Sequence, residues 1–166
     1  MVAGLGSGIV LAPSNAAVSN IALELLNLNC FQITDVCVLG ENCDESVKFL
    51  NPRFRSKQYH VFKKEYDKLD RPKLEKVREF CSWLRLDPKR SSVSEIELLC
   101  PRVDDTRKGE ENLRRAVSAA KVVLCTLNTA GSASLRSLVK NKNFATLFLD
   151  EASQCPEAHF YICEIV

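Results

Sequence analysis

The chain has 166 residues, within the size range of one domain, and its 46% hydrophobic and 27% charged residues are an ordinary globular balance. Its 23 basic and 21 acidic residues leave a formal net charge of +2, which excludes a global field that attracts nucleic acid or membrane. Any nucleic-acid contact must therefore be local.

The first forty residues predict a strand, a helix and a second strand. Residues 8–12 form a short apolar run that is typical of a strand buried on both faces of a parallel sheet. Ser14 or Asn15 can cap a following helix, whose apolar residues recur at three- and four-residue spacing. Residues 33–39 predict another strand, which Gly40 ends. This alternation indicates an α/β fold.

The next segment, residues 41–115, has dense charges and apolar residues at helical intervals, so we expect a helical insertion. Residues 70–72 (DRP) can break one helix and start the next, and residues 92–95 (SVSE) predict a capping box. A further helix is expected over 110–120. The charge run 63–68 predicts a solvated face, and a basic stripe that contacts nucleic acid is the alternative.

The α/β alternation returns in the last part of the chain. Strands are expected over 122–125 and 146–149, and helices over 134–139 and 157–163. The second of these strands is expected to be buried. The organisation is then a first part of an α/β domain, an insertion and a return to that domain, over residues 1–40, 41–115 and 116–166.

The eight cysteines are scattered and form no C-x-x-C pair. Zinc needs four converging ligands, and only His60 and His159 are available to help, so a zinc site is not expected. Reduced core cysteines fit a cytoplasmic or nuclear protein. The apolar residues 1–13 lack the basic start of a signal peptide, and no stretch is apolar for long enough to span a membrane. We therefore expect no membrane partner.

The strongest chemical signal is the pair Asp150 and Glu151, which directly follows the apolar run 146–149. In an open parallel sheet, ligands bind beyond the carboxyl ends of the strands. The first carboxylate can hold Mg²⁺ there, and the second can orient the water that attacks a γ-phosphate. The alternative is an acidic strand end that only caps the following helix.

Three segments resemble motifs of superfamily 1 helicases, in particular the branch that contains the nonsense-mediated-decay helicase and senataxin. Residues 12–18 (APSNAAV) resemble motif Ia, residues 123–126 (VLCT) with 130–132 (AGS) resemble motif Ib, and residues 150–154 (DEASQ) resemble motif II. The three occur in the family's order. Residues 46–50 (SVKFL) and the helices after them look like the stalk and side domain that this branch carries.

The resemblance implies a partial RecA-like P-loop NTPase fold, an α/β parallel sheet with a mainly helical insertion. It implies that Ser14, Asn15, Thr126 and Gly131 lie along a single-strand channel, where hydroxyls, amides and backbone N–H groups contact phosphates. Glycine at 131 would allow close backbone approach. Simple helix capping for Ser14, and a strand-end hydroxyl for Thr126, are the structural alternatives.

The resemblance also implies nucleotide chemistry, with Asp150 as the Mg²⁺ residue, Glu151 as the water residue and Gln154 as a nucleotide contact. The phosphate loop G-x-x-x-x-G-K-[ST] does not occur, because residues 4–8 (GLGSG) contain no lysine. Motif III and the second RecA-like domain are also not recognised. We therefore expect that this chain alone neither binds ATP and Mg²⁺ tightly nor hydrolyses ATP.

The sequence as a whole predicts a segment of an ATP-dependent RNA or DNA helicase motor. Its partners would be single-stranded nucleic acid and the remaining helicase domains. A helicase-derived binding module without catalysis is the alternative. An unrelated α/β phosphohydrolase that uses Asp150 for metal binding is a third possibility, but it leaves the other two motifs unexplained.

Overall fold

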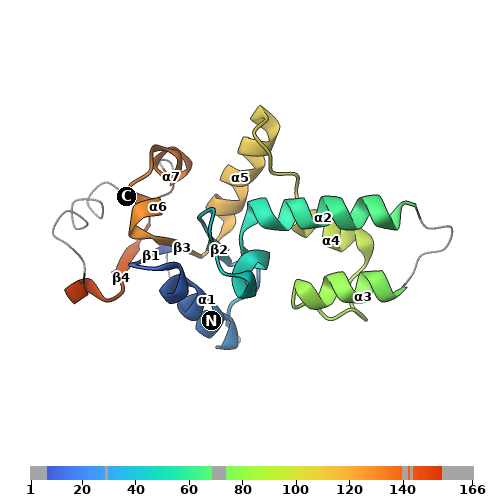
Figure 1. The fold of residues 1–166 in the computed structure, drawn as a ribbon, viewed down its shortest axis with the longest axis horizontal. Helices are drawn as coiled ribbons and strands as arrows, with labels where there is room; N and C mark the ends of the chain where they lie inside the picture. The colour runs from blue at the N-terminus through green and yellow to red at the C-terminus, as the bar shows by residue number, and fades with distance from the viewer. Residues whose placement is uncertain (1–6, 29, 69–73, 140–141, 143, 155–166) are drawn as a thin grey trace.

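A computed structural model describes residues 7–28, 30–68, 74–139, 142 and 144–154. Its centre is a four-stranded parallel sheet in the order β2-β3-β1-β4 (Figure 1). The strands are β1 (Gly8–Ala12), β2 (Val36–Val38), β3 (Val122–Thr126) and β4 (Thr146–Leu149). Helices lie on both faces of the sheet, so the predicted α/β fold is confirmed.

The alternation of side chains along the strands divides the core into two layers. From β1, Ile9 and Leu11 enter one cluster, whereas Val10 and Ala12 face the other. The cluster around Val10 and Ala12 is covered by α1 (Asn15–Asn27) and by the inserted helices. The opposite cluster is covered by α5 (Arg107–Ala119), α6 (Leu127–Ala130) and α7 (Ala133–Val139). A parallel sheet covered on both faces explains why its central strands are almost wholly apolar.

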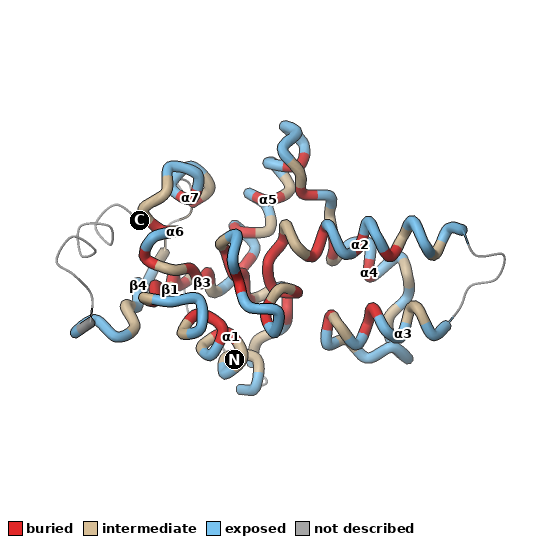
Figure 2. The backbone as a smooth tube through the Cα atoms, viewed as in Figure 1, coloured by how far each residue is buried: buried red, intermediate tan, exposed pale blue. Residues whose placement is uncertain are grey.

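The insertion projects from the sheet on the right of Figure 1. It consists of η1 (Glu45–Leu50), a 3-10 helix, followed by α2 (Pro52–Tyr66), α3 (Leu74–Trp83) and α4 (Val93–Leu99). Tyr59, Phe62 and Phe80 pack together, and the Phe62 and Phe80 rings stack with centroids 4.6 Å apart. Figure 2 shows these inward faces buried and the outer faces exposed. The insertion therefore shares one core with a face of the sheet.

Capping residues fix where the inserted helices begin. The predicted capping box is confirmed, since the backbone N–H of Ser92 donates to Glu95 Oε2 at 2.6 Å and the N–H of Glu95 donates back to Ser92 Oγ at 3.3 Å. Thr106 caps α5, which therefore begins at Arg107 and not at residue 110. α5 crosses the predicted domain boundary at 115 and packs Leu113 and Val117 onto the sheet.

One expected strand is shorter than predicted. β2 covers only Val36–Val38, because a turn joins the backbone N–H of Asp35 to the carbonyl of Gln32 just before it. The expected helix over 157–163 lies outside the described residues. None of the described helices is long and apolar enough to cross a membrane.

β4 was expected to be buried, and this expectation is wrong. Leu147 is 41% exposed and Phe148 is 58% exposed. The reason is the strand order, which places β4 at an edge of the sheet with β1 as its neighbour. An edge strand of the described sheet is covered less than a central one, although its sequence is equally apolar.

Candidate functional site

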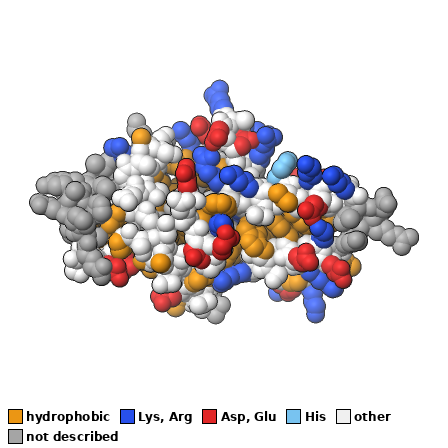
Figure 3. Space-filling model, in the orientation of Figure 1, with side chains coloured by type: hydrophobic (Ala, Val, Ile, Leu, Met, Phe, Trp, Pro, Cys, Tyr) orange, Lys and Arg blue, Asp and Glu red, His pale blue; other side chains and the backbone are white. Residues whose placement is uncertain are grey.

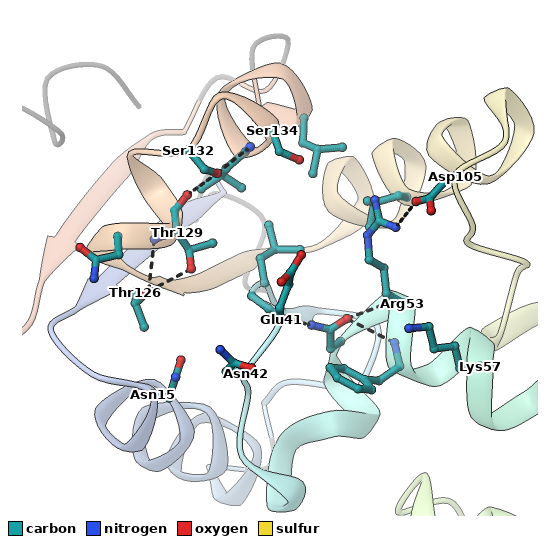
Figure 4. A pocket seen from close by; sticks show the side chains of 18 residues that line it. Asn15, Glu41, Asn42, Arg53, Lys57, Asp105, Thr126, Thr129, Ser132 and Ser134 are labelled. Carbon is teal, nitrogen blue, oxygen red and sulfur yellow. Dashed lines mark hydrogen bonds and ion pairs between the residues drawn. The ribbon is translucent and has the colours of Figure 1, made fainter.

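A groove of about 840 Å³ lies at the carboxyl ends of β1, β2 and β3. Its walls come from segments that are far apart in the sequence, as Figure 4 shows. One wall is built from the residues after β1 and β3 together with α7, and the other from the start of α2. The carboxyl ends of parallel strands are where α/β folds bind ligands, so this groove is the first candidate for a functional site.

The wall on the sheet side is lined with uncharged polar groups. The Thr126 hydroxyl accepts a hydrogen bond from the backbone N–H of Thr129 at 3.2 Å and lies 2.9 Å from the Thr129 hydroxyl. The Ser132 hydroxyl donates to the Thr129 carbonyl at 2.7 Å. The exposed Asn15, the first residue of α1, contributes its amide beside them. These groups offer donors and acceptors without a formal charge.

The wall on the insertion side is basic and aromatic. Arg53 and Lys57, one turn apart on α2, both line the groove, and Arg53 Nη1 donates to Asp105 Oδ1 at 3.0 Å. Between them, the ring of Phe54 also lines the groove, with the Lys57 amino group 5.8 Å from its centroid. Glu41 is the other carboxylate in the lining. Cations beside an aromatic ring form a surface suited to an anion that carries planar rings.

Asn51 joins the end of β2 to the start of α2, the helix that forms one wall of the groove. Its side-chain Oδ1 accepts from the backbone N–H of Arg53 at 3.0 Å and caps α2, while its Nδ2 donates to the carbonyl of Gly40 at 2.9 Å. Gly40 follows β2 and has φ +138°, a conformation that side-chain-bearing residues rarely adopt. Asn51 itself is only 3% exposed, and both hydrogen bonds are part-buried. The end of β2 and the start of α2 are thus fixed relative to each other.

The cysteines near the groove are not poised for nucleophilic chemistry. Burial raises the pKa of Cys37, in β2, and of Cys125, directly before Thr126, to about 12. A thiol with such a pKa stays protonated at neutral pH, and the thiolate is the reactive form. Five of the described cysteines are buried and Cys30 is exposed. The expectation of core cysteines is therefore confirmed for those five.

Asp150 and Glu151 lie beyond β4, and neither is among the residues that line the groove. The backbone N–H of Asp150 donates to the carbonyl of Leu11 at 2.9 Å, so the pair begins level with the end of β1. Glu151 has φ +50°, an uncommon conformation for a residue with a side chain, and such backbones gather at functional sites. Gln154 ends η2 (Ala152–Gln154), the 3-10 helix that follows.

The residues after β4 offer Mg²⁺ two carboxylates. Mg²⁺ is usually held by one or two carboxylates together with water and nucleotide phosphates, and Asp150 with Glu151 offers such a pair. Within the described ranges, no three His, Cys, Asp or Glu side chains gather into a metal site. The pair therefore suits an ion that arrives with a nucleotide.

The structure brings together two of the four residues expected to contact nucleic acid. Asn15 and Thr126 come from separate motifs and line the same groove. Ser14 is not in the lining, and its hydroxyl caps α1 by accepting from the Ala17 N–H at 3.1 Å. Gly131 is also outside the lining, and its N–H donates to the Leu127 carbonyl at 3.0 Å. That N–H is engaged within the protein and is not presented to a ligand.

Several groove residues were not anticipated from the sequence. Thr129 and Ser132 follow Thr126 at three-residue spacing, a pattern that could have indicated hydroxyls on one side of a helical turn. Arg53 and Lys57 have the four-residue spacing of one helix face, but the sequence gives no sign that this face meets the sheet. Asn51 had no recognisable signal beyond its place before Pro52.

The chain has no match among curated proteins. A family model described as an AAA domain matches residues 8–163, nearly the whole chain. The match includes all four strands and all the residues of the groove. The parallel sheet with its helices is consistent with a partial RecA-like P-loop domain. The chain therefore belongs to the AAA domain family, as a superfamily 1 helicase-like P-loop NTPase domain.

Proposed function

We propose that this chain is part of an ATP-dependent helicase motor and holds a single strand of RNA or DNA in the groove at the carboxyl ends of β1, β2 and β3. The branch of the nonsense-mediated-decay helicase and senataxin is proposed on the three motifs alone. The parent reaction would be Mg²⁺-dependent ATP hydrolysis coupled to movement along the strand. Family membership supports the ATPase class.

The observation that carries the nucleic-acid role is the meeting of Asn15 and Thr126. These residues are 111 positions apart in the sequence (126 − 15), and each was singled out by a different motif. Both line one groove, which is polar on their side and basic on the other. Two independent predictions that converge on one surface support a shared ligand.

The chemistry of the lining favours a strand whose sequence is not read. The Asn15 amide and the Thr126 hydroxyl can donate to phosphate oxygens, and Arg53 adds a charged donor. Phe54 offers a ring on which a base can stack. Stacking and phosphate contacts tolerate every base, as a motor that moves along a strand requires.

The nucleotide side of the proposal rests on Asp150 and Glu151. Asp150 would hold the metal, Glu151 would orient the attacking water, and Gln154 would contact the nucleotide. Bound Mg²⁺ would supply charge stabilisation to the transferred phosphoryl group. The phosphate loop G-x-x-x-x-G-K-[ST] does not occur in the 166 residues, so we expect no ATP turnover from the isolated chain. Turnover stimulated by RNA in the purified chain would contradict this.

The same groove would also serve a second candidate, a helicase-derived module that binds nucleic acid without catalysis. The two candidates differ in whether the chain needs the remaining helicase domains. A cooperative unfolding transition of the isolated chain, together with salt-sensitive binding to single strands, would favour the module.

Binding is tested by fluorescence anisotropy with labelled oligothymidine and oligouridine over a series of salt concentrations. We expect log K to fall linearly with log salt concentration. Asn15→Ala should weaken binding about five-fold, the effect of losing roughly one hydrogen bond. Asn20→Ala, on the exposed side of the same helix, is the matched control. Equal affinity of the two variants, or no binding by the unaltered chain, would refute the claim that the groove binds a single strand.

A further inference from the structure

We propose that the groove continues along α2 as a track for nucleic-acid phosphates, formed by Arg53, Lys57, His60 and Lys64. This proposal rests on the proposed nucleic-acid function and adds a surface on the insertion, outside the sheet. Arg53 and Lys57 belong to both the groove and the track. His60 and Lys64 extend the track beyond the groove, because neither of them lines it.

The spacing of these four residues places them on one face of the helix. They are four, three and four positions apart, which keeps them within a narrow arc at 3.6 residues per turn. The opposite face carries Tyr59 and Phe62, which are buried in the core. Lys57, His60 and Lys64 are all exposed. Figure 3 shows Lys and Arg side chains gathered over α2.

The positive charge of this face is not neutralised by the acids of its own helix. Asp67 pairs with Lys63 at 2.6 Å, and Glu65 pairs with Lys76 of α3. Both acids are therefore engaged by lysines outside the track. Within the described residues, Arg53 has an ion pair, with Asp105, while Lys57 and Lys64 have none. Lys64 therefore presents its charge to solvent or to a ligand.

The dimensions suit a strand that leaves the groove. The eleven residue steps from Arg53 to Lys64 rise about 16 Å along the helix. A stacked strand advances about 3.4 Å per nucleotide, so the track spans roughly five nucleotides. Continuity with the groove favours nucleic acid over an acidic protein, because the same strand would meet Phe54 and Arg53 before it reaches Lys64.

The test compares a short oligothymidine that fills only the groove, about 5 nucleotides, with one of about 12 nucleotides that also covers the track. Lys64→Gln in the full 166-residue chain should lower the salt slope for the longer probe by about 0.7. That corresponds to about five-fold weaker binding at 0.1 M salt. The shorter probe should bind equally well to both proteins. Lys64→Arg, which keeps the charge, should restore the longer probe's affinity.

Lys89→Gln, an exposed lysine outside the track, is the matched control and should leave both probes unaffected. If the unaltered chain binds and Asn15→Ala weakens it, but Lys64→Gln behaves like Lys89→Gln, the track is refuted and the groove stands. If the unaltered chain binds neither probe, the proposed function itself fails. Displacement of the longer probe by polyglutamate at equal charge would assign the track to an acidic protein and overturn the proposal.

Discussion

Asn51 provides the sharpest test of how the groove is built, because it is the contact between the end of β2 and the start of α2. Replacing it with alanine removes both the cap of α2 and the hydrogen bond to the Gly40 carbonyl. Replacing it with serine keeps an oxygen that can cap the helix but is too short to reach Gly40. The two variants therefore separate the two hydrogen bonds.

The expected loss can be worked from these contacts. Removal of a helix cap costs about 1 kcal/mol. Loss of the hydrogen bond to the half-buried Gly40 carbonyl costs about 1–2 kcal/mol. Asn51→Ala should therefore lower the free energy of unfolding by about 2–3 kcal/mol. Asn51→Ser should lose about 1–2 kcal/mol, because its cap survives.

The free energy of unfolding is measured by urea denaturation, with the fluorescence of Trp83, the one tryptophan of the chain, as the probe. Trp83 packs against the core cluster that the insertion shares with the sheet. With a slope of about 2 kcal/mol per molar, Asn51→Ala should shift the midpoint by about 1 M. Asn42→Ala, an exposed asparagine of the same groove, is the matched control and should change stability by less than about 0.5 kcal/mol.

Two results would refute this reasoning. If Asn51→Ala is as stable as Asn42→Ala, this side chain does not hold the end of β2 against the start of α2. If Asn51→Ser is as unstable as Asn51→Ala, the cap contributes nothing and the account of the helix start is wrong.

Three further predictions follow from buried and capping groups. Arg55 is 6% exposed, burial lowers its pKa, and its Nε has no hydrogen-bond partner among the described residues. Arg55→Met should therefore leave the free energy of unfolding in urea unchanged or raise it by up to about 2 kcal/mol. A loss above about 1 kcal/mol would contradict this. Hydrogen bonds from the backbone and hydroxyl of Ser92 lower the pKa of Glu95 below its usual 4.5. The resulting stabilisation is present above that value and is lost as pH falls through the lowered pKa. Ser92→Ala removes the hydroxyl but keeps the backbone N–H, so NMR titration should find the pKa of Glu95 raised only part of the way toward 4.5. An unchanged pKa would show that the Ser92 hydroxyl contributes nothing. A further variant has the two cysteines beyond residue 154 replaced by serine. In that variant a thiol reagent at pH 8 should label Cys30 at once and the five buried cysteines only in urea. Rapid labelling of more than one thiol in the native chain would argue against the buried core.

Local signals in the sequence predicted the elements well where one physical cause dominates. The apolar runs of β1 and β3 predicted central strands, because burial on both faces requires such residues. Ser92 and Glu95 predicted the start of α4, since the capping box is a contact between residues three apart. α5 was placed three residues late, because Thr106 was not recognised as its cap.

Features that depend on tertiary neighbours were not predicted. The apolar sequence of β4 resembles that of β1, and only the strand order shows that Leu147 and Phe148 lie at an edge. In the candidate site, motif resemblance identified Asn15 and Thr126 but not the wall opposite them. That wall comes from α2, whose apolar periodicity indicates that one face packs on a core but not which part of the sheet that face meets. The roles of Asp150, Glu151 and Gln154 stay predictions.

The central claim, that the groove binds a single strand, is tested most directly by mapping where the strand lies. Oligouridine that carries 4-thiouridine would be photocrosslinked to the 166-residue chain, and the crosslinked peptides identified by mass spectrometry. We expect crosslinks to Phe54 and to other residues within 39–57 and 126–135, the segments that supply most of the groove lining. Crosslinks confined to the exposed edge at Leu147 and Phe148, with none in those segments, would contradict the claim.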